Sequence, residues 1–367
     1  MEASDRACRI RLQRLFLPAT TALAQDDGTL VFGEPNYGSD QHGLVWGYLI
    51  VPGEPAQEID ADGALKWLAA GNAERGDSFL WLHFSLSNTA SERWMRKRLD
   101  LPDSFYESLT EKAVSTRLEQ EGNALVALIN DVSFDSTVDS SSVSSVSISL
   151  EPRLLVSARL RPLRSVDRLR AAIRAGQSFR SSTELLAQLL RDQADVLAGI
   201  VREATARVDL IEDKLLANQL TTSRRELGSL RRVLVRLQRL LAPEPAALFR
   251  LLNRPPVWIG GEDLQDLRQS GEEFSAAVAD SAALAERVKL LQEEFAALTN
   301  EQTSRTLFIL TLVTVLALPI NLVAGLFGMN VGGIPLAEHR HGFVLIIGLL
   351  AVITGVLGYI GLRNRGE

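Results

Sequence analysis

The sequence predicts an α+β domain in α/β/α layers, followed by a long stalk helix and two C-terminal transmembrane helices. Residues 306–337 contain no Asp, Glu, Lys or Arg, and residues 341–362 form a second apolar run without these charges. A bilayer core about 30 Å thick needs roughly 20 mostly apolar helical residues, so each run is long enough to cross it. The preceding residues alternate short apolar runs with charged amphipathic stretches, a pattern typical of a water-soluble α+β region.

Composition argues against several classes of protein. The 367 residues carry 39 Lys and Arg against 45 Asp and Glu, and this net formal charge of −6 argues against a nucleic-acid partner. The one cysteine, Cys8, excludes a disulfide framework and a cysteine-based zinc cage. Residues 1–16 lack the apolar core of a signal peptide. We find no Walker loop, GxSxG or HExxH motif, and therefore expect neither an enzyme nor a cofactor.

Charges around the two apolar runs predict the orientation of the chain. Arg305 precedes the first run, and Arg363 and Arg365 follow the second, whereas the connecting loop has Arg340 offset by Glu338. By the positive-inside rule, both ends of this multi-pass chain and its large front region lie in the cytoplasm.

Elements of the front region follow from its apolar runs. Runs rich in aromatic and β-branched residues predict strands, and polar amphipathic stretches between them predict helices. The expected strands are 44–51, 79–84, 124–134 and 143–158, with a hairpin loop at 135–142 and helices at 61–70 and 91–98.

Beyond residue 165 the pattern becomes helical. Leu, Val and Ile recur at spacings of three and four over 166–241, until Pro243 and Pro245 break the pattern. No proline lies between Glu262 and Pro319, which predicts one helix over 262–327, roughly 100 Å long. Two helices broken near residues 299–300 are the alternative.

The expected divisions of the chain follow these changes of pattern. They are an α/β domain at 1–165, a helical stalk-packing region at 166–261, the water-exposed stalk helix at 262–305, a pore-lining transmembrane helix at 306–327, an external loop at 328–341, a second transmembrane helix at 342–362 and a cytoplasmic tail at 363–367.

One stripe of the first transmembrane helix combines apolar and polar residues at a spacing of three or four. Its members are Leu307, Leu310, Thr314, Leu318, Asn321 and Gly325. Polar residues within a membrane usually face a partner helix or a water-filled cavity, and one hairpin cannot enclose a path, so a pore requires several copies around an axis. Rings of Leu307 and Leu310 could then gate by dewetting, and Asn321 could offer carbonyl oxygens to a hydrated cation. Alternatively, Thr314 and Asn321 only hydrogen-bond between packed helices.

A short motif at the outer end of this helix makes a resemblance specific. Gly328-Met329-Asn330 follows a proline-bearing helix and precedes the final apolar run. In this context the motif resembles the GMN motif of the CorA family of divalent-cation transporters. The resemblance implies a homopentameric funnel in the bacterial inner membrane and a selectivity ring of Asn330. It also implies a lower polar ring of Asn321 and a hydrophobic neck of Leu307 and Leu310.

The loop after the motif separates branches of this family. Magnesium transporters commonly continue to MPEL, whereas residues 331–336 read VGGIPL and residues 318–327 read LPINLVAGLF. This combination resembles the ZntB branch of zinc transporters. That resemblance implies zinc as the transported substrate, with uptake driven by a proton gradient. A magnesium or broad divalent-cation channel of the same fold, and a membrane-anchored coiled-coil scaffold, are the alternatives.

Two further groups of residues are candidates for cation handling. In the external loop, imidazole and carboxylate side chains suit zinc better than magnesium; they belong to Glu338, His339 and His341. On the stalk, Glu293 and Glu301 approach the cytoplasmic mouth and could attract cations. The alternative for each group is a solvated surface without a role in transport. His83, inside an apolar run, is expected to be a core residue with hydrogen-bond partners.

Overall fold

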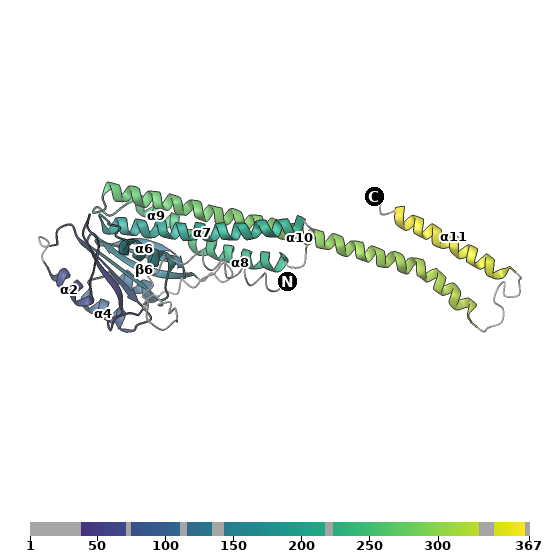
Figure 1. The fold of residues 1–367 in the computed structure, drawn as a ribbon, viewed down its shortest axis with the longest axis horizontal. Coiled ribbons are helices and arrows are strands. Elements are labelled where there is room, and N and C mark those ends of the chain that lie inside the picture. Colours follow the sequence, from purple (N-terminus) through teal and green to yellow (C-terminus); the bar gives the residue numbers. More distant parts are fainter. Residues whose placement is uncertain are drawn as a thin grey trace, which may run out of the picture.

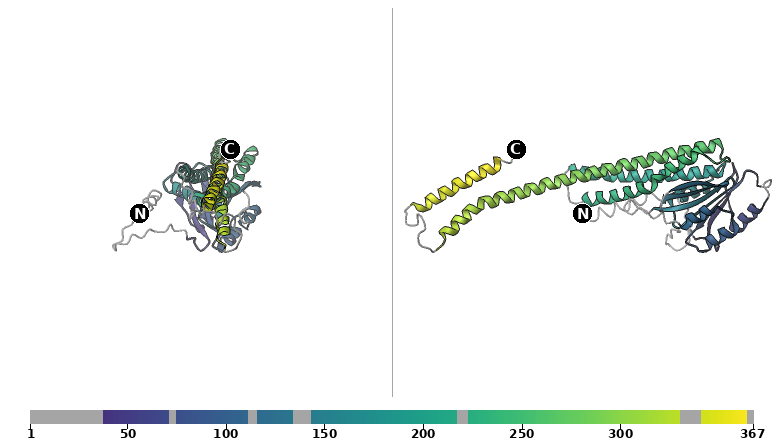
Figure 2. Two further views of the ribbon diagram at one scale, coloured as in Figure 1. Left: turned by 90° about the vertical axis from the view of Figure 1, so that its right-hand side faces the viewer. Right: turned by 180° about the vertical axis from the view of Figure 1, so that it is seen from behind.

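The chain forms an elongated molecule with a sheet domain at one end and a single helix that extends far beyond the rest (Figure 1). In this computed structural model the described residues are 38–70, 75–110, 116–133, 143–216, 223–329 and 341–363. A bundle of helices joins the sheet domain to the extended helix, and the last helix folds back alongside it (Figures 1 and 2).

A seven-stranded mixed sheet organises the first domain. Its spatial order is β2-β1-β3-β7-β6-β5-β4, and all neighbouring strands are antiparallel except β3 and β7. The strands are β1 (Leu44–Ile50), β2 (Gln57–Glu58), β3 (Phe79–Ser85), β4 (Arg117–Glu121), β5 (Ala124–Val132), β6 (Val143–Glu151) and β7 (Leu154–Arg159).

Helices cover both faces of the sheet, which confirms the expected α/β/α layers. Strand β3 demonstrates the alternation, because Phe79 and Trp81 point into one core and Leu80 and Leu82 into the other. The second core is closed by α2 (Ala61–Ala69), α4 (Ala90–Arg98) and α5 (Asp103–Thr110). The first is closed by the helices that lead to the membrane.

Most of the predicted strands are confirmed, with three differences, the first of which is that the two-residue edge strand β2 was not predicted. The run 143–158 is two strands, β6 and β7, which turn at Pro152 and Arg153 and pair with each other. Strand β4 was not predicted, because it lies at the edge of the sheet and its sequence, RLEQE, contains one buried residue, Leu118. The predicted hairpin loop 135–142 lies outside the described residues, although β5 and β6 do pair antiparallel.

The helical region after the sheet comprises four helices before the long one. They are α6 (Arg164–Arg174), α7 (Ser182–Leu216), α8 (Ser223–Leu241) and α9 (Pro243–Asn253). The stretch expected to be helical over 166–241 thus divides among the first three of these. Pro243 ends the pattern as expected, and it also begins α9, because proline suits the first turn of a helix.

The predicted long helix is confirmed as α10 (Gly261–Phe327), which has 67 residues. Its first half packs against α7, α8 and α9. It buries Phe274, Leu284 and Val288 in a third apolar cluster, which is the core of the helix bundle. Arg287 on α10 also pairs with two acids of α7, Asp209 at 2.8 Å and Glu212. The apolar seam and these ion pairs hold the first half of α10 to the bundle, whereas its second half extends beyond the bundle and has only α11 beside it.

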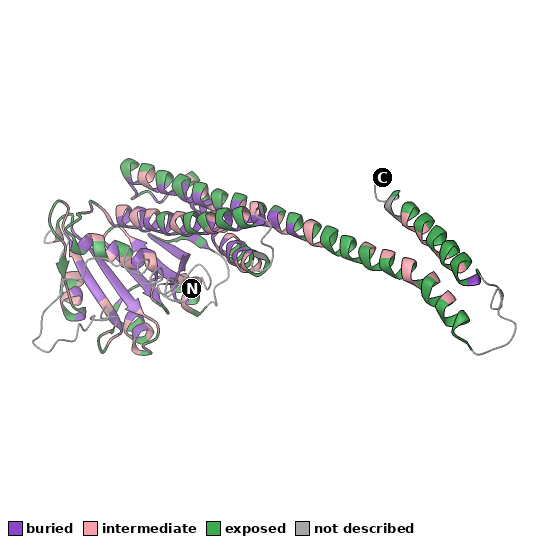
Figure 3. Cartoon of the chain, turned by 45° about the vertical axis from the view of Figure 1, so that its right-hand side comes forward, coloured by how far each residue is buried: buried purple, intermediate pink, exposed green. Residues whose placement is uncertain are grey.

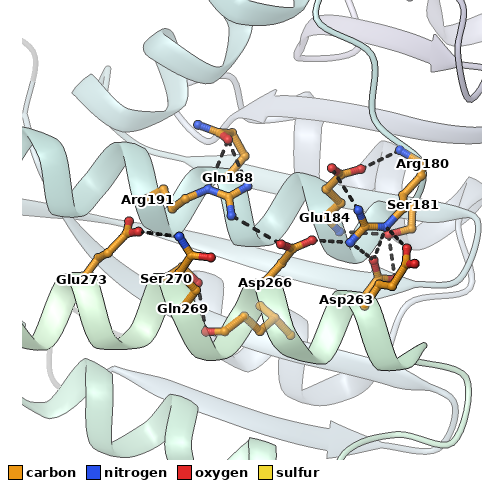
Figure 4. Close-up of polar contacts among 12 residues, drawn as sticks. Arg180, Ser181, Glu184, Gln188, Arg191, Asp263, Asp266, Gln269, Ser270 and Glu273 are labelled. Atoms are coloured by element: carbon orange, nitrogen blue, oxygen red, sulfur yellow. Dashed lines mark hydrogen bonds and ion pairs between the residues drawn. The ribbon is translucent and has the colours of Figure 1, made fainter.

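Ion pairs also join the starts of α7 and α10 (Figure 4). Arg180, just before α7, contacts Glu184 of α7 and the carboxylates of Asp263 and Asp266 on α10. Ser181 donates a hydrogen bond to Asp263 at 2.8 Å. One arginine therefore bridges both helices at the end of the bundle farthest from the membrane helices.

Candidate membrane pore

The outer half of α10 and most of α11 (Gly342–Arg363), from Phe343 to Ile360, expose apolar side chains (Figure 3). Both helices are long and apolar enough to cross a membrane. Leu318 is 66% exposed and Phe343 is 76% exposed, a costly arrangement in water that a bilayer removes.

Helix α11 covers one side of α10. Five of the six partly buried residues of α10 between residues 306 and 327 recur at the spacing of one helical face: Phe308, Leu312, Leu316, Pro319 and Val323; the sixth is Ala317. A Cβ added at Gly358 of α11 would lie 3.9 Å from Leu316, so the two helices approach closely there. The glycine permits this approach.

The predicted stripe lies on the opposite side of α10. Its members are all exposed in the single chain: Leu307, Leu310, Thr314, Leu318, Asn321 and Gly325. At 100° per residue, this stripe and the face toward α11 point roughly 150° apart. The hairpin therefore leaves its polar face free of its own second helix.

Two residues affect the backbone of this part of α10: Thr314 on the stripe and Pro319 on the face toward α11. Thr314 donates its hydroxyl hydrogen bond to the Leu310 carbonyl at 2.9 Å, and its oxygen can still accept a hydrogen bond from outside. Pro319 lies inside the helix, where it cannot donate to the carbonyl of Val315. Within a membrane such a freed carbonyl needs another hydrogen-bond partner.

The GMN motif begins where α10 ends. Gly328 caps the helix by donating its backbone N–H to the Ala324 carbonyl at 2.9 Å, and the Met329 side chain is 52% exposed. Asn330, Glu338 and His339 lie outside the described residues. His341 is exposed at the start of α11, where its carbonyl accepts from Leu345 at 3.1 Å.

The two stalk acids occupy different sides of α10. Both Glu293 and Glu301 are exposed. Glu301 lies seven residues before Phe308, on the side that farther along the helix faces α11. Glu293 lies fourteen residues before Leu307 and within about 40° of the polar stripe. The geometry therefore groups Glu293, and not Glu301, with the stripe.

His83 is a core residue, as expected. It is fully buried, accepts a hydrogen bond from Arg159 Nε at its Nε2 (2.7 Å), and lies 2.7 Å from the Ser157 hydroxyl through Nδ1. The acceptor role of Nε2 places the ring proton on Nδ1. Among the described residues, no group of three or more His, Cys, Asp or Glu side chains could hold a metal ion.

A large α/β domain, a continuous helix into an apolar hairpin and a polar stripe on that hairpin define a membrane protein of the ion-transporter class. The family model for the CorA-like Mg²⁺ transporter protein matches residues 76–360. The chain belongs to this family of divalent-cation transporters and is accordingly not an enzyme.

Curated relatives and solved structures agree with this membership. The zinc transport protein ZntB of Pectobacterium atrosepticum is 23% identical over 84% of this chain and 94% of its own. The divalent cation transporter CmaX of Pseudomonas aeruginosa is 27% identical over 89% of this chain and 97% of its own. The structure of full-length CmaX protein matches with a TM-score of 0.76 and 25% identity, covering 89% of this chain and 99% of that one.

A more distant structure shares the fold. The CorA magnesium transporter from Methanocaldococcus jannaschii matches with a TM-score of 0.70 and 20% identity, over 86% of this chain and 96% of that one. The fold thus extends over the sheet domain, the stalk and the membrane helices together.

Proposed function

We propose that this chain takes up zinc by Zn²⁺:H⁺ symport, as a homopentamer in the bacterial inner membrane. The observation that carries the pore is the polar stripe of α10, which points away from α11 and remains exposed in the single chain. Copies arranged around an axis would bring these stripes together and enclose a path. Zinc as the ion is supported by the relatives named as zinc transport proteins and by the VGGIPL loop, residues 331–336.

The proposed path begins at the external end with the selectivity ring of Gly328, Met329 and Asn330. Amide oxygens of such a ring accept hydrogen bonds from the water shell of a hydrated cation. Below it, Asn321 forms a second polar ring, and Leu307 and Leu310 form the neck near the cytoplasm, which closes by dewetting. Thr314, Leu318 and Gly325 line the space between them.

Charged groups serve the two mouths of this path. Glu338, His339 and His341 collect cations outside, and imidazoles there titrate near neutral pH. Glu293 attracts cations at the cytoplasmic end, whereas Glu301 lies on another side of the helix. Both chain termini lie in the cytoplasm. The segments of the chain described under "Sequence analysis" end at residues 165, 261, 305, 327, 341 and 362.

A magnesium or broad divalent-cation channel of the same fold is the second candidate. It is favoured by the likeness to CmaX, a divalent cation transporter, at 27% identity. The ring chemistry proposed for Asn330 acts on hydrated cations and does not by itself select zinc.

The principal test is zinc uptake into proteoliposomes, with Asn330→Ala beside the wild type. We expect uptake to fall at least about tenfold, because each subunit loses one oxygen of the ring and about 1.4 kcal/mol of stabilisation corresponds to tenfold. Asn253→Ala, an exposed residue at the end of α9, is the matched control and should transport normally. Full uptake by Asn330→Ala would overturn the assignment of the ring.

The same vesicles distinguish the two candidates. Zinc symport predicts faster zinc uptake when the outside is more acidic, and little competition from magnesium. Uptake that ignores the imposed pH gradient, with magnesium competing at similar concentrations, would instead identify a broad divalent-cation channel.

A further inference from the structure

A layer of polar residues divides the apolar interior between the sheet and the stalk. The core under the sheet includes Ile129, Leu190 and Ala247, whereas the core of the helix bundle includes Val132, Ala194 and Leu241. Along β5, along α7 and from α8 into α9, buried polar side chains lie between the residues of one core and those of the other. They are Asn130 and Asp131 on β5, Gln193 on α7 and Glu244 on α9.

Hydrogen bonds connect the layer across four elements. The Gln193 amide Nε2 donates to the Asn130 carbonyl and to Glu244 Oε2, the latter at 3.0 Å. The Asn130 amide Nδ2 donates to the Leu240 carbonyl near the end of α8 at 3.3 Å. Asn130, Gln193 and Glu244 are each at most 2% exposed. These bonds therefore tie the sheet to α7, α8 and α9 in a site closed to water.

Acceptors outnumber donors in this layer. Three fully buried oxygens have no hydrogen-bond partner among the residues that the structure describes: Asn130 Oδ1, Gln193 Oε1 and Glu244 Oε1. Rotating the Gln193 amide would not help, because its oxygen would then face two other oxygens. A buried acceptor without a donor costs roughly 1–3 kcal/mol. A proton on Glu244 turns one of these acceptors into a donor and so reduces the imbalance.

The charges around Glu244 also favour its neutral form. Burial and the carboxylate of Asp131 raise the pKa of Glu244 well above its ordinary value, against the hydrogen bonds from Gln193 and Thr116. Arg191 and Asp192 of α7 contact Gln188 instead. Within the described ranges no cationic side chain pairs with Glu244, and the N-terminus of α9 is the remaining group that favours the anion.

Asp131 differs from Glu244 because its anion is well supplied with donors. It accepts hydrogen bonds from the Ser165 backbone and hydroxyl and from the Val132 backbone. Burial raises its pKa to about 6 despite these bonds. At neutral pH Asp131 is therefore largely ionised, and a second negative charge on Glu244 would be repelled by it.

We propose that Glu244 is a proton-binding site that controls the joint between the sheet domain and the stalk. With the proton bound, the layer is closed. When the pH around this domain rises and the proton leaves, two buried anions and the unpaired acceptors draw water into the layer. Helix α9 then loosens from β5 and α7, and because α9 packs on α10, the change reaches the helix that continues to the membrane. The proposal does not depend on which ion the pore carries.

The protonation state can be read directly by infrared spectroscopy of the full-length protein in detergent. The difference spectrum, wild type minus Glu244→Gln, should contain the carbonyl stretch of a protonated carboxylic acid at neutral pH, and this band should disappear as the pH is raised. Its absence at neutral pH would overturn the proposal.

Hydrogen exchange tests the loosening of the joint. After correction for intrinsic rates, amides of α9 and β5 in the wild type should exchange at least about tenfold faster at a pH where the infrared band has disappeared than at pH 7. Glu244→Gln and Glu244→Met, which cannot ionise, should lack this increase, whereas Glu272→Gln, an exposed residue of α10, should keep it. An increase that persists in both Glu244 variants would refute the proton site.

Treatment with a chelator tests the alternative that a bound cation, and not a proton on Glu244, stabilises the polar layer. Treatment with EDTA should leave the infrared band and the exchange rates unchanged. If EDTA alone loosens α9 at neutral pH, a cation rather than a proton holds the layer, and the proposal fails.

Discussion

Inside the sheet, His83 is held neutral by its surroundings. Its ring stacks on Trp46 with centroids 4.2 Å apart and accepts a hydrogen bond from the buried side chain of Arg159. Burial, together with the positive charges of Arg159 and Arg170, holds the pKa of His83 well below the ordinary value of 6.5. A proton on this ring would remove the acceptor of Arg159 and place two cations side by side.

Acidification should therefore destabilise the fold through His83. Below about pH 6.5 the unfolded chain binds a proton that the folded chain does not, so stability falls as the pH falls through this range. Thermal unfolding of full-length protein should show a smaller loss between about pH 7 and pH 5 for His83→Gln than for the wild type. His42→Gln, outside the core, should lose as much as the wild type; equal losses in all three would contradict this account.

At the scale of elements, apolar packing contributes more than ion pairs to holding α10 against the bundle. Phe274 is 2% exposed, in the seam with α7 and α8, whereas the Arg287 side chain is 42% exposed although it pairs with two acids. Solvent screens partly exposed ion pairs, so their contribution is small compared with that of a filled core position.

Two substitutions should rank these contributions. Phe274→Ala should lower the free energy of unfolding by about 3–5 kcal/mol, because it leaves a cavity in the seam. Arg287→Gln should lower it by less than about 1 kcal/mol. Chemical denaturation of the full-length chain in detergent measures both, and a larger loss for Arg287→Gln would contradict the ranking.

At the scale of the whole molecule, the single chain leaves one face of its first membrane helix uncovered. One face of the membrane part of α10 is covered by α11, and the polar face has no partner within the described chain. The acidic α/β domain stands at the far end of the stalk, so any signal from it to the membrane travels along α10 (Figure 2).

Cysteine cross-linking can locate the faces of α10 in the assembly. In a Cys8→Ala background, Leu310→Cys should form disulfide-linked dimers on oxidation, because the stripe of each copy faces the common axis. Leu316→Cys, on the face toward α11, should remain monomeric on denaturing gels. Cross-linking of Leu316→Cys alone would reverse the proposed orientation of the hairpin.

Much of the fold could be predicted because it depends on local patterns. Strands β1, β3 and β5 are apolar runs, and α10 is a long stretch without proline before Pro319. Strand β4 could not be predicted, since an edge strand buries little and Leu118 alone carries no periodic signal. The break between α6 and α7 was likewise missed, because both sides of residues 175–181 continue a helical pattern.

The candidate pore, like the fold, has features that the sequence predicts and features that depend on packing. The stripe of α10 follows from helical spacing alone, but its position opposite α11 depends on how two helices pack. The polar layer around Glu244 had no signal in the sequence, because its residues are separated by up to about 110 positions and meet only in the folded chain.

The sequence by itself determined the membrane hairpin, the continuous stalk helix and the GMN motif, because hydropathy and helical periodicity are properties of neighbouring residues. Tertiary structure decided which face of α10 is free and how a polar layer divides two cores. These features depend on contacts between distant elements, where burial changes the energy of a charge or a hydrogen bond. Burial of this kind cannot be read from the order of residues along the chain.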